Sequence, residues 1–139
     1  MARNGVGVGL VAVAALALGA CSSDSKVVTV NPNIYPAQYK QEIVATLRSV
    51  LNDPTHVRNA LISDPALTPV DKDQRYTVCV QLTERDPYSQ QYAAPQTRIA
   101  YFFAGHLNQF VKANDDQCAK AAYKPFPEAE KLCLVKKCA

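Results

Sequence analysis

Alternation of side-chain character over residues 74–83 is the feature that most constrains the fold of this chain. Apolar and polar residues take turns there, which is typical of a β-strand with one face against a core and the other toward water. Strands of that kind belong to antiparallel sheets, because parallel sheets are covered on both faces. The predicted core face holds Tyr76, Val78, Val80 and Leu82, and the opposite face holds Thr77, Cys79 and Gln81.

A helical period precedes this strand. Apolar residues at spacings of four, four and three form one stripe on a helix, made of Tyr39, Ile43, Leu47 and Val50. Pro36 suits the first turn of a helix, and Asn52-Asp53-Pro54 ends it, because the residue before a proline avoids the α region. One amphipathic helix is therefore predicted over residues 36–51.

The remaining local signals complete an α+β prediction. Tyr101, Phe102, Phe103 and Phe110 are expected to supply the aromatic core. We expect one N-terminal amphipathic helix packed on an antiparallel sheet of about four strands, with a disulfide-tied C-terminal tail. The other predicted segments are a strand over 57–63, turns over 64–69, an exposed loop over 84–97, strands over 98–103 and 107–112 around a three-residue loop at 104–106, and a short helix near 127–135.

Residues 1–20 have the pattern of a cleaved signal peptide. Arg3 precedes an uncharged run from residue 5 to residue 20 that contains only Gly, Val, Leu and Ala. A transmembrane anchor is the weaker alternative, because a spanning helix needs about 20 apolar residues and no stop-transfer charges follow. In the whole chain, 15 Lys and Arg stand against 12 Asp and Glu, which excludes a nucleic-acid-binding protein that relies on bulk charge.

The end of this run, Leu18-Gly19-Ala20-Cys21, resembles the lipobox of bacterial lipoproteins. The resemblance implies cleavage before Cys21 and attachment of a thioether-linked diacylglycerol to it, with a third acyl chain such as palmitate on its amino group in Gram-negative bacteria. Ser22, at the position that follows the lipidated cysteine, implies the periplasmic face of the outer membrane. Residues 21–33 would be the anchor and tether of a single domain over 34–139. The alternative is a secreted protein cut after Ala20.

The mature chain is similar to small, uncharacterised lipoproteins of alphaproteobacteria, and this similarity brings no activity with it. Its basis is the set of segments 34–40, 51–54 and 75–79, together with Cys118, Tyr123 and residues 125–128.

Four cysteines remain for a compartment that oxidises thiols: Cys79, Cys118, Cys133 and Cys138. Their even number favours two disulfides, and three pairings are open. We favour Cys79 with Cys118 and Cys133 with Cys138. The alternative is a redox or metal site, which would lack the usual pair of cysteines with two residues between them.

No catalytic residue, metal ligand or cofactor site is predicted. His56 and His106 have no partner pattern, and none of Ser49, Ser63 and Ser89 stands in a nucleophile motif. The acidic pairs Glu84 with Asp86, Asp71 with Asp73, and Asp115 with Asp116 lack the spacing of a calcium loop, so solvated turns are expected.

Residues 123–127 form the one segment with the character of a binding motif, because proline can hold Tyr123 and Phe126 in an extended display for a partner. The alternative is that both rings pack back over the sheet edge.

The leading hypothesis is a non-enzymatic, lipid-anchored envelope module that binds a protein or glycan. The second is a small ligand-binding or hydrolytic enzyme with a site near residues 84–97 and His106. The third is an inhibitor or immunity-type protein with one tight soluble partner.

Overall fold

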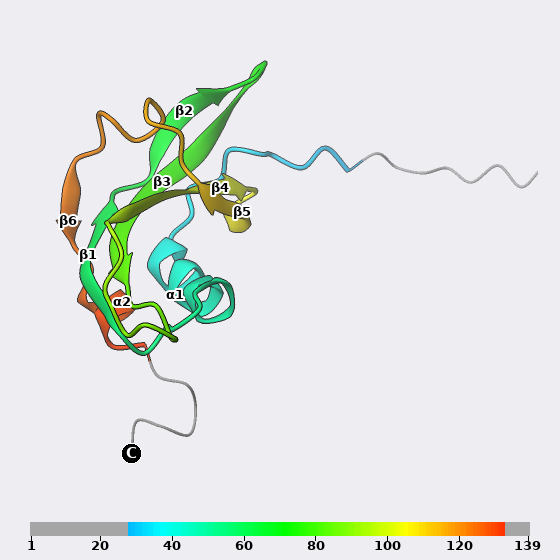
Figure 1. Cartoon of the computed structure of the whole chain (residues 1–139). Coiled ribbons are helices and arrows are strands. Elements are labelled where there is room, and N and C mark those ends of the chain that lie inside the picture. Colours follow the sequence, from blue (N-terminus) through cyan, green and yellow to red (C-terminus); the bar gives the residue numbers. More distant parts are fainter. Residues whose placement is uncertain (1–27, 133–139) are drawn as a thin grey trace, which may run out of the picture.

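The computed structural model describes residues 28–132, which form one six-stranded antiparallel sheet with two helices (Figure 1). Residues 1–27 and 133–139, and with them Cys21, Cys133 and Cys138, lie outside the described part. The elements are α1 (Tyr39–Val50), β1 (Val57–Ser63), β2 (Ala66–Val70), β3 (Asp73–Glu84), β4 (Gln96–Phe103), β5 (His106–Lys112), β6 (Tyr123–Pro125) and α2 (Pro127–Glu130).

The centre of the sheet is β3, the strand with the alternating pattern. Strand order is β5-β4-β3-β1-β6, and β2 also pairs with β3. Thr77 pairs with Ala66 of β2 on one side and with Tyr101 of β4 on the other, so β1 and β2 share one edge of β3. The predicted count of about four strands is wrong, because β2 and β6 were not recognised.

Residues 64–69 are not simply turns, as the sequence suggested. Asp64 and Pro65 interrupt the pairing, and β2 begins at Ala66. Pro65 and Pro69 gave the misleading turn signal. Pro69 fits in β2 because this strand pairs only with β3, and a proline is tolerated on an edge strand whose outward position needs no N–H donor.

One face of the sheet, the helix face, carries the main core. Helix α1 lies within the interval 36–51, and its side chains Ile43 and Leu47 are fully buried against the sheet. Val50, predicted to complete the stripe, is 38% exposed, and Leu51 is buried after the helix ends. From β3, Val78, Val80 and Leu82 belong to the same core, as the alternation predicted.

The predicted aromatic core is only partly correct. Phe102 is fully buried, Tyr101 and Phe110 are half-buried, and Phe103 is exposed. Neighbouring residues on a strand point to opposite faces, so Phe102 and Phe103 cannot both enter one core. Phe126 supplies the second fully buried ring.

Phe126 is buried because the proline-rich segment adds to the sheet. Residues 123–125 form β6, which pairs with residues 61–63 of β1, and the Phe126 N–H then donates to the Ala60 carbonyl at 2.8 Å. Phe126 is therefore unavailable to a partner, and the alternative that the segment packs over the sheet edge is the one observed. Helix α2 follows and ends at Glu130, well short of residue 135.

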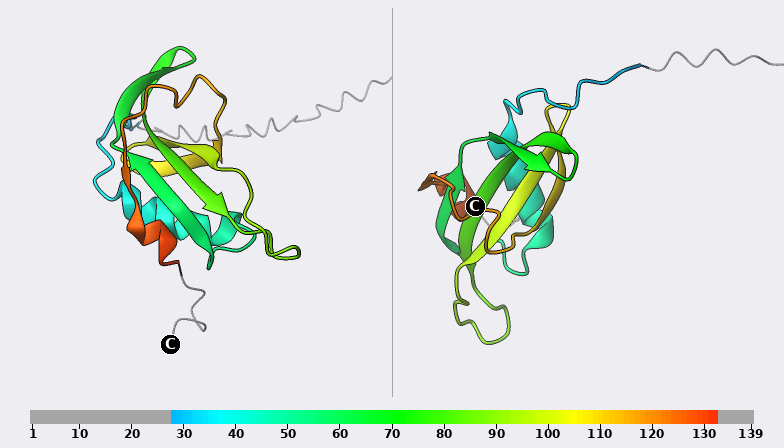
Figure 2. Two further views of the ribbon diagram at one scale, coloured as in Figure 1. Left: turned by 60° about the vertical axis from the view of Figure 1, so that its left-hand side comes forward. Right: turned by 90° about the horizontal axis from the view of Figure 1, so that it is seen from above.

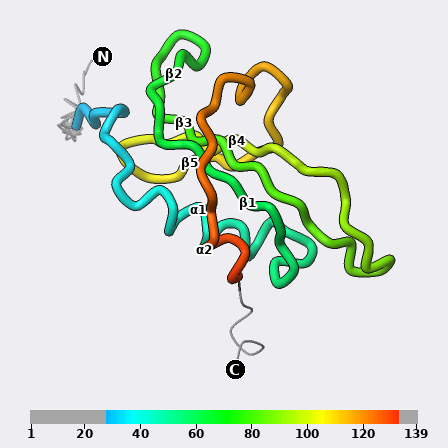
Figure 3. The backbone as a smooth tube through the Cα atoms, turned by 90° about the vertical axis from the view of Figure 1, so that its left-hand side faces the viewer, coloured from blue at the N-terminus to red at the C-terminus, as the bar shows by residue number. Residues whose placement is uncertain are grey.

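Residues 113–122, here called the strap, cross the second face of the sheet, the strap face. Figure 3 follows the strap, in orange, from the end of β5 to β6. These strands are the two edges of the sheet, about 19 Å apart at the usual strand spacing. The Cys79–Cys118 disulfide, one of the predicted pairings, ties the strap to β3. Cys79 and Ile99 of the sheet form a small second core with Cys118 of the strap.

The connections between strands define two ends of the molecule. The turn end holds the β2–β3 turn at Asp71 and Lys72 and the β4–β5 turn at Ala104 and Gly105. The loop end holds residues 85–95 between β3 and β4. The β4–β5 turn has two residues, both at positive φ, rather than the predicted three, and His106 already pairs with Phe103. A positive φ is readily adopted by glycine, which suits Gly105.

Candidate binding surface

The strap covers only part of the strap face. Residues opposite each other in an antiparallel ladder point to the same side, so the pairs Thr68 with Arg75, Thr77 with Tyr101, and Tyr101 with Gln109 all lie on the face that also carries Cys79. The strap lies over Cys79 and Ile99, and the region between it and the turn end holds open hollows. This open face consists of the exposed or half-buried residues Thr68, Val70, Arg75, Tyr101 and Gln109, and Thr77 is buried beneath it.

Three adjoining hollows make the open face concave. The largest, about 470 Å³, lies between the strap and the break between β1 and β2, and the second, about 430 Å³, shares Thr68 and Gln117 with it. A third of about 180 Å³ shares Tyr101 and Gln109 with the second and reaches Arg75. Ligand pockets typically enclose 300 to 1,000 Å³, so the two larger hollows are of a suitable size.

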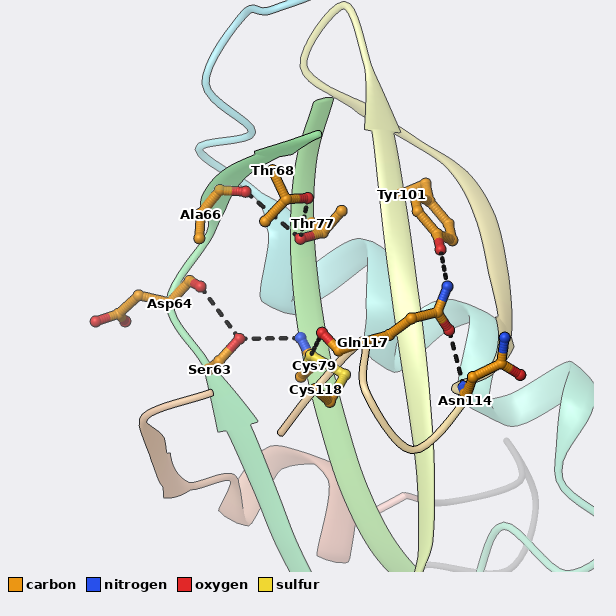
Figure 4. The surroundings of a disulfide bond; sticks show 10 residues. All are labelled: Ser63, Asp64, Ala66, Thr68, Thr77, Cys79, Tyr101, Asn114, Gln117 and Cys118. Carbon is orange, nitrogen blue, oxygen red and sulfur yellow. Dashed lines mark hydrogen bonds between the residues drawn. A yellow bond between two sulfur atoms is a disulfide. The ribbon is translucent and has the colours of Figure 1, made fainter. Parts of the chain in front are cut away.

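The strap positions the aromatic side chain of this surface. The Gln117 side chain donates from Nε2 to the Tyr101 hydroxyl at 2.8 Å, and its Oε1 accepts from the Asn114 N–H at 2.8 Å (Figure 4). The amide oxygen of Gln117 is thereby held within the strap, and its amide nitrogen orients the Tyr101 ring on β4. The disulfide one residue further on, at Cys118, holds this part of the strap on the sheet.

Hydroxyl groups line the other side of the surface. The Thr68 and Thr77 hydroxyls lie 3.0 Å apart, and both belong to the largest hollow. Ser63, at its far end, accepts from the Cys79 N–H at 2.9 Å and donates to the Asp64 carbonyl at 3.1 Å. This hydroxyl completes the hydrogen bonding of the backbone where β1 breaks, which is a structural role.

The structure does not bring together residues 84–97 and His106, the two parts of the alternative predicted site. These segments lie at opposite ends of the eight-residue strand β4, which spans roughly 23 Å (Figure 2). His106 Nδ1 instead contacts Glu42 of α1 at 3.1 Å, and the imidazole is largely exposed. Glu42 also accepts from the Leu107 N–H, so this contact fastens α1 to the β4–β5 hairpin.

A second polar cluster surrounds Asp53 at the loop end. Its carboxylate accepts from the Thr55 hydroxyl at 2.6 Å and from Arg85 Nη2 at 2.9 Å, and it lies 3.0 Å from His56 Nδ1. Desolvation raises the pKa of Asp53, but hydrogen bonds from Thr55, His56 and Arg85 outweigh it and hold this pKa well below its ordinary value. The cluster joins the α1–β1 connection to the end of β3.

The acidic pairs do not converge on a metal site. Among residues 28–132, no group of three or more His, Cys, Asp and Glu side chains is placed to hold a metal ion. The prediction that Glu84 lies in a solvated turn is wrong. Glu84 is buried, and its carboxylate accepts from the Asn52 N–H at 2.8 Å. No helix within the described range is long and apolar enough to span a membrane.

Sequence reasoning identified Tyr123 and Phe126 as partner-binding candidates and missed the open face. Tyr123 is half-buried beside the strap, and Phe126 belongs to the main core. The sequence signal that could have revealed the open face is the polar side of the alternation, Thr77 and Cys79, which lies on the second face of β3. The part of the open face that β2 supplies, Thr68 and Val70, was missed because residues 64–69 were interpreted as turns.

Comparison with known proteins adds no assignment to this geometry. No protein-family model matches the chain, and neither a curated protein nor a solved structure is significantly similar to it.

Proposed function

We propose that this chain is a lipid-anchored protein of the bacterial cell envelope, on the periplasmic face of the outer membrane, that acts as a non-enzymatic binding module. The open face would hold its partner, an envelope protein or a glycan. The observation that carries the proposal is that the strap covers part of one sheet face and leaves a concave, mixed apolar and polar region beside it.

The composition of the open face favours binding of an extended partner. Tyr101 offers a ring edge and a hydroxyl, and Arg75 offers a guanidinium group, while Thr68 and Gln109 offer uncharged donors and acceptors. The ring is already held by Gln117, so less conformational freedom is lost when a partner contacts it. Several small hollows in a row suit a chain of repeated units better than one compact molecule.

The proposed lipid anchor is supported by the sequence and by the disulfide, and not by the open face. The lipobox-like sequence ends at Cys21, and the Cys79–Cys118 disulfide is compatible with an oxidising compartment outside the cytoplasm. The Pro32 carbonyl accepts from the Ala104 N–H at 2.9 Å, so contacts with the domain begin two residues before the predicted boundary at residue 34. A second disulfide between Cys133 and Cys138 remains part of the proposal.

Site-specific photocrosslinking in the host tests the proposal. A photoreactive phenylalanine analogue replaces Tyr101 in one strain and Tyr88, 94% exposed in the loop at the other end of the sheet, in a control strain. We expect one discrete adduct from position 101 and none from position 88. Digestion of the adduct by protease or by a glycan hydrolase then identifies the partner as protein or glycan. Absence of an adduct at position 101, or equal adducts from both positions, would contradict the proposal.

The anchor has its own control. The Cys21→Ser variant should lose its acyl mass, because a serine hydroxyl cannot form the thioether bond, and intact mass spectrometry of the membrane-bound and released protein measures this loss. A wild-type chain without acyl chains would overturn the anchor and leave the open-face result to stand by itself.

A further inference from the structure

Exposed large apolar side chains gather at the turn end. Among the described residues nine such side chains are exposed, and six of them lie on the segment that enters the domain, in β2 or beside the β4–β5 turn: Val28, Val30, Ile34, Tyr35, Leu67 and Phe103. They are between 38% and 79% exposed. We call these six residues the turn-end surface. The remaining three lie elsewhere. Val50 is the last residue of α1, Tyr88 is in the loop at the loop end, and Val111 is in β5.

Contacts with the sheet fix most of this surface in place. Ile34 packs over Gly105, where an added Cβ would lie only 3.1 Å from the Ile34 side chain. The Tyr35 ring meets the Tyr76 ring edge-on at 5.4 Å, and Tyr76 is the cross-strand partner of Leu67. Such apolar residues are exposed on a supported surface rather than on a loose end, which is the usual sign of an interaction site.

The position of the chain before residue 28 indicates what covers the turn-end surface. Val28 is seven residues after Cys21, so the two lie within about 25 Å of each other even if the chain is fully extended. The segment that follows Val28 first contacts the domain at the turn end, where the Pro32 carbonyl accepts from the Ala104 N–H at 2.9 Å, so acyl chains on Cys21 would attach the molecule to the bilayer through this end. Tyrosine is also among the residues that prefer the interface between lipid and water.

The charged side chains at the turn end do not give it a net charge that would attract it to an anionic lipid surface. The β2–β3 turn carries Asp71, Lys72 and Asp73 together, and Arg75 lies over the Phe103 ring at 5.3 Å from the guanidinium carbon to the ring centre. Contact with lipid at this end would depend on apolar burial, so it should tolerate both high salt and uncharged lipid.

We propose that the turn-end surface rests on the lipid bilayer that holds the anchor, an inference that builds on the proposed acylation of Cys21. The loop end then points away from the membrane, since β3 alone extends up to about 36 Å between the two ends. The open face lies between them, beside the bilayer and within reach of a partner that runs along it.

Fluorescence of single-tryptophan variants tests this orientation, because the natural chain contains no tryptophan. The full lipoprotein, purified from host membranes as Tyr35→Trp or as the control Tyr88→Trp, is reconstituted into phosphatidylcholine vesicles with and without brominated acyl chains. We expect strong quenching and a blue shift for Tyr35→Trp only, unchanged in high salt. Quenching of Tyr35→Trp no greater than that of Tyr88→Trp would overturn the inference.

A second variant separates contact with lipid from a second copy of the chain. Ile34→Ser with Leu67→Ser, placed in the Tyr35→Trp background, should weaken quenching while thermal unfolding shows that the domain remains folded. A blue shift that is independent of bromine and is accompanied by a dimer in ultracentrifugation would mean that another copy covers the surface, and would overturn the inference.

Flotation and mass measurement distinguish this failure from failure of the anchor. A protein that carries acyl chains and floats with the vesicles, but whose Tyr35→Trp fluorescence is not quenched, contradicts the orientation alone. A protein that lacks acyl chains and does not float contradicts both proposals.

Discussion

The two faces of the sheet are covered in different ways, although both use side chains of β3. On the helix face, fourteen buried residues form one continuous core beneath α1 and α2. On the strap face, only Cys79, Ile99 and Cys118 form a buried cluster, and a disulfide fastens the cover. The comparison indicates a division of roles: apolar burial on the helix face stabilises the fold, and a covalent bond on the strap face leaves room for a binding surface.

Removal of the disulfide is expected to have the largest effect. Cys79 and Cys118 are separated by 39 positions, and a crosslink of that span contributes about 4 kcal/mol in the chain-entropy description. The Cys79→Ala/Cys118→Ala variant should lose about that much stability in urea unfolding, with faster hydrogen exchange at residues 113–122 than in α1. Equal acceleration in α1 and the strap would contradict the separation of the two faces.

The helix face should respond to loss of volume. Leu47→Ala removes a fully buried side chain and should cost about 3 kcal/mol, since leucine to alanine changes in cores cost 2 to 5 kcal/mol. Val50→Ala, one turn further along α1 and 38% exposed, is the matched control and should cost less than about 1 kcal/mol. Urea unfolding of both variants measures the difference, and equal losses would place the core elsewhere.

Acid should weaken the connection that leads from the helix face into β1. Because folding lowers the pKa of Asp53 from its ordinary value of 3.8, its stabilisation is complete above that value and is lost as the pH falls toward the lowered pKa. Asp53→Asn should cost about 2 kcal/mol at neutral pH through weakened hydrogen bonds to Arg85, His56 and Thr55.

Urea unfolding between pH 7 and pH 2 checks this point. The difference between the natural chain and Asp53→Asn should shrink at the acid end of the series. A difference that grows as the pH falls would show that folding raises the pKa of Asp53 instead of lowering it.

The smallest effect on stability is expected at the open face. Tyr101→Ser removes a half-buried ring and its bond to Gln117 and should cost about 1 kcal/mol, yet it should abolish capture of the partner. Tyr88→Ser at the loop end should change neither quantity. Crosslinking yield from a reporter at position 109 measures capture, and an unchanged yield in Tyr101→Ser would remove this ring from the binding surface.

Much of the helix face was predictable, because burial on one side leaves a periodic signal in the sequence. The alternation at residues 74–83 and the stripe of Ile43 and Leu47 both entered the main core. The Cys79–Cys118 pairing was among three open possibilities, and a small number of cysteines limits the choices. The first observation concerns residues whose environment is set by their own local pattern, whereas the second depends on the small number of cysteines and not on local periodicity.

The strap face was not predictable in the same way. Prolines at 65 and 69 hid β2, and the proline at 125 hid β6, since edge strands tolerate a residue that central strands exclude. The open face combines side chains from β2, β3, β4 and β5 whose alignment depends on register. Register between distant strands is a tertiary property, and the break at Asp64 and Pro65 gave no local sign of it.

Hydroxyl-radical footprinting of the protein in intact host envelopes, compared with the purified protein, tests the central claim most directly. Tyr101, half-buried on the open face, should be oxidised much less in the envelope, while Tyr88 at the loop end should be oxidised equally in both samples. Equal oxidation of Tyr101 in both samples would mean that nothing occupies the open face and would contradict the account.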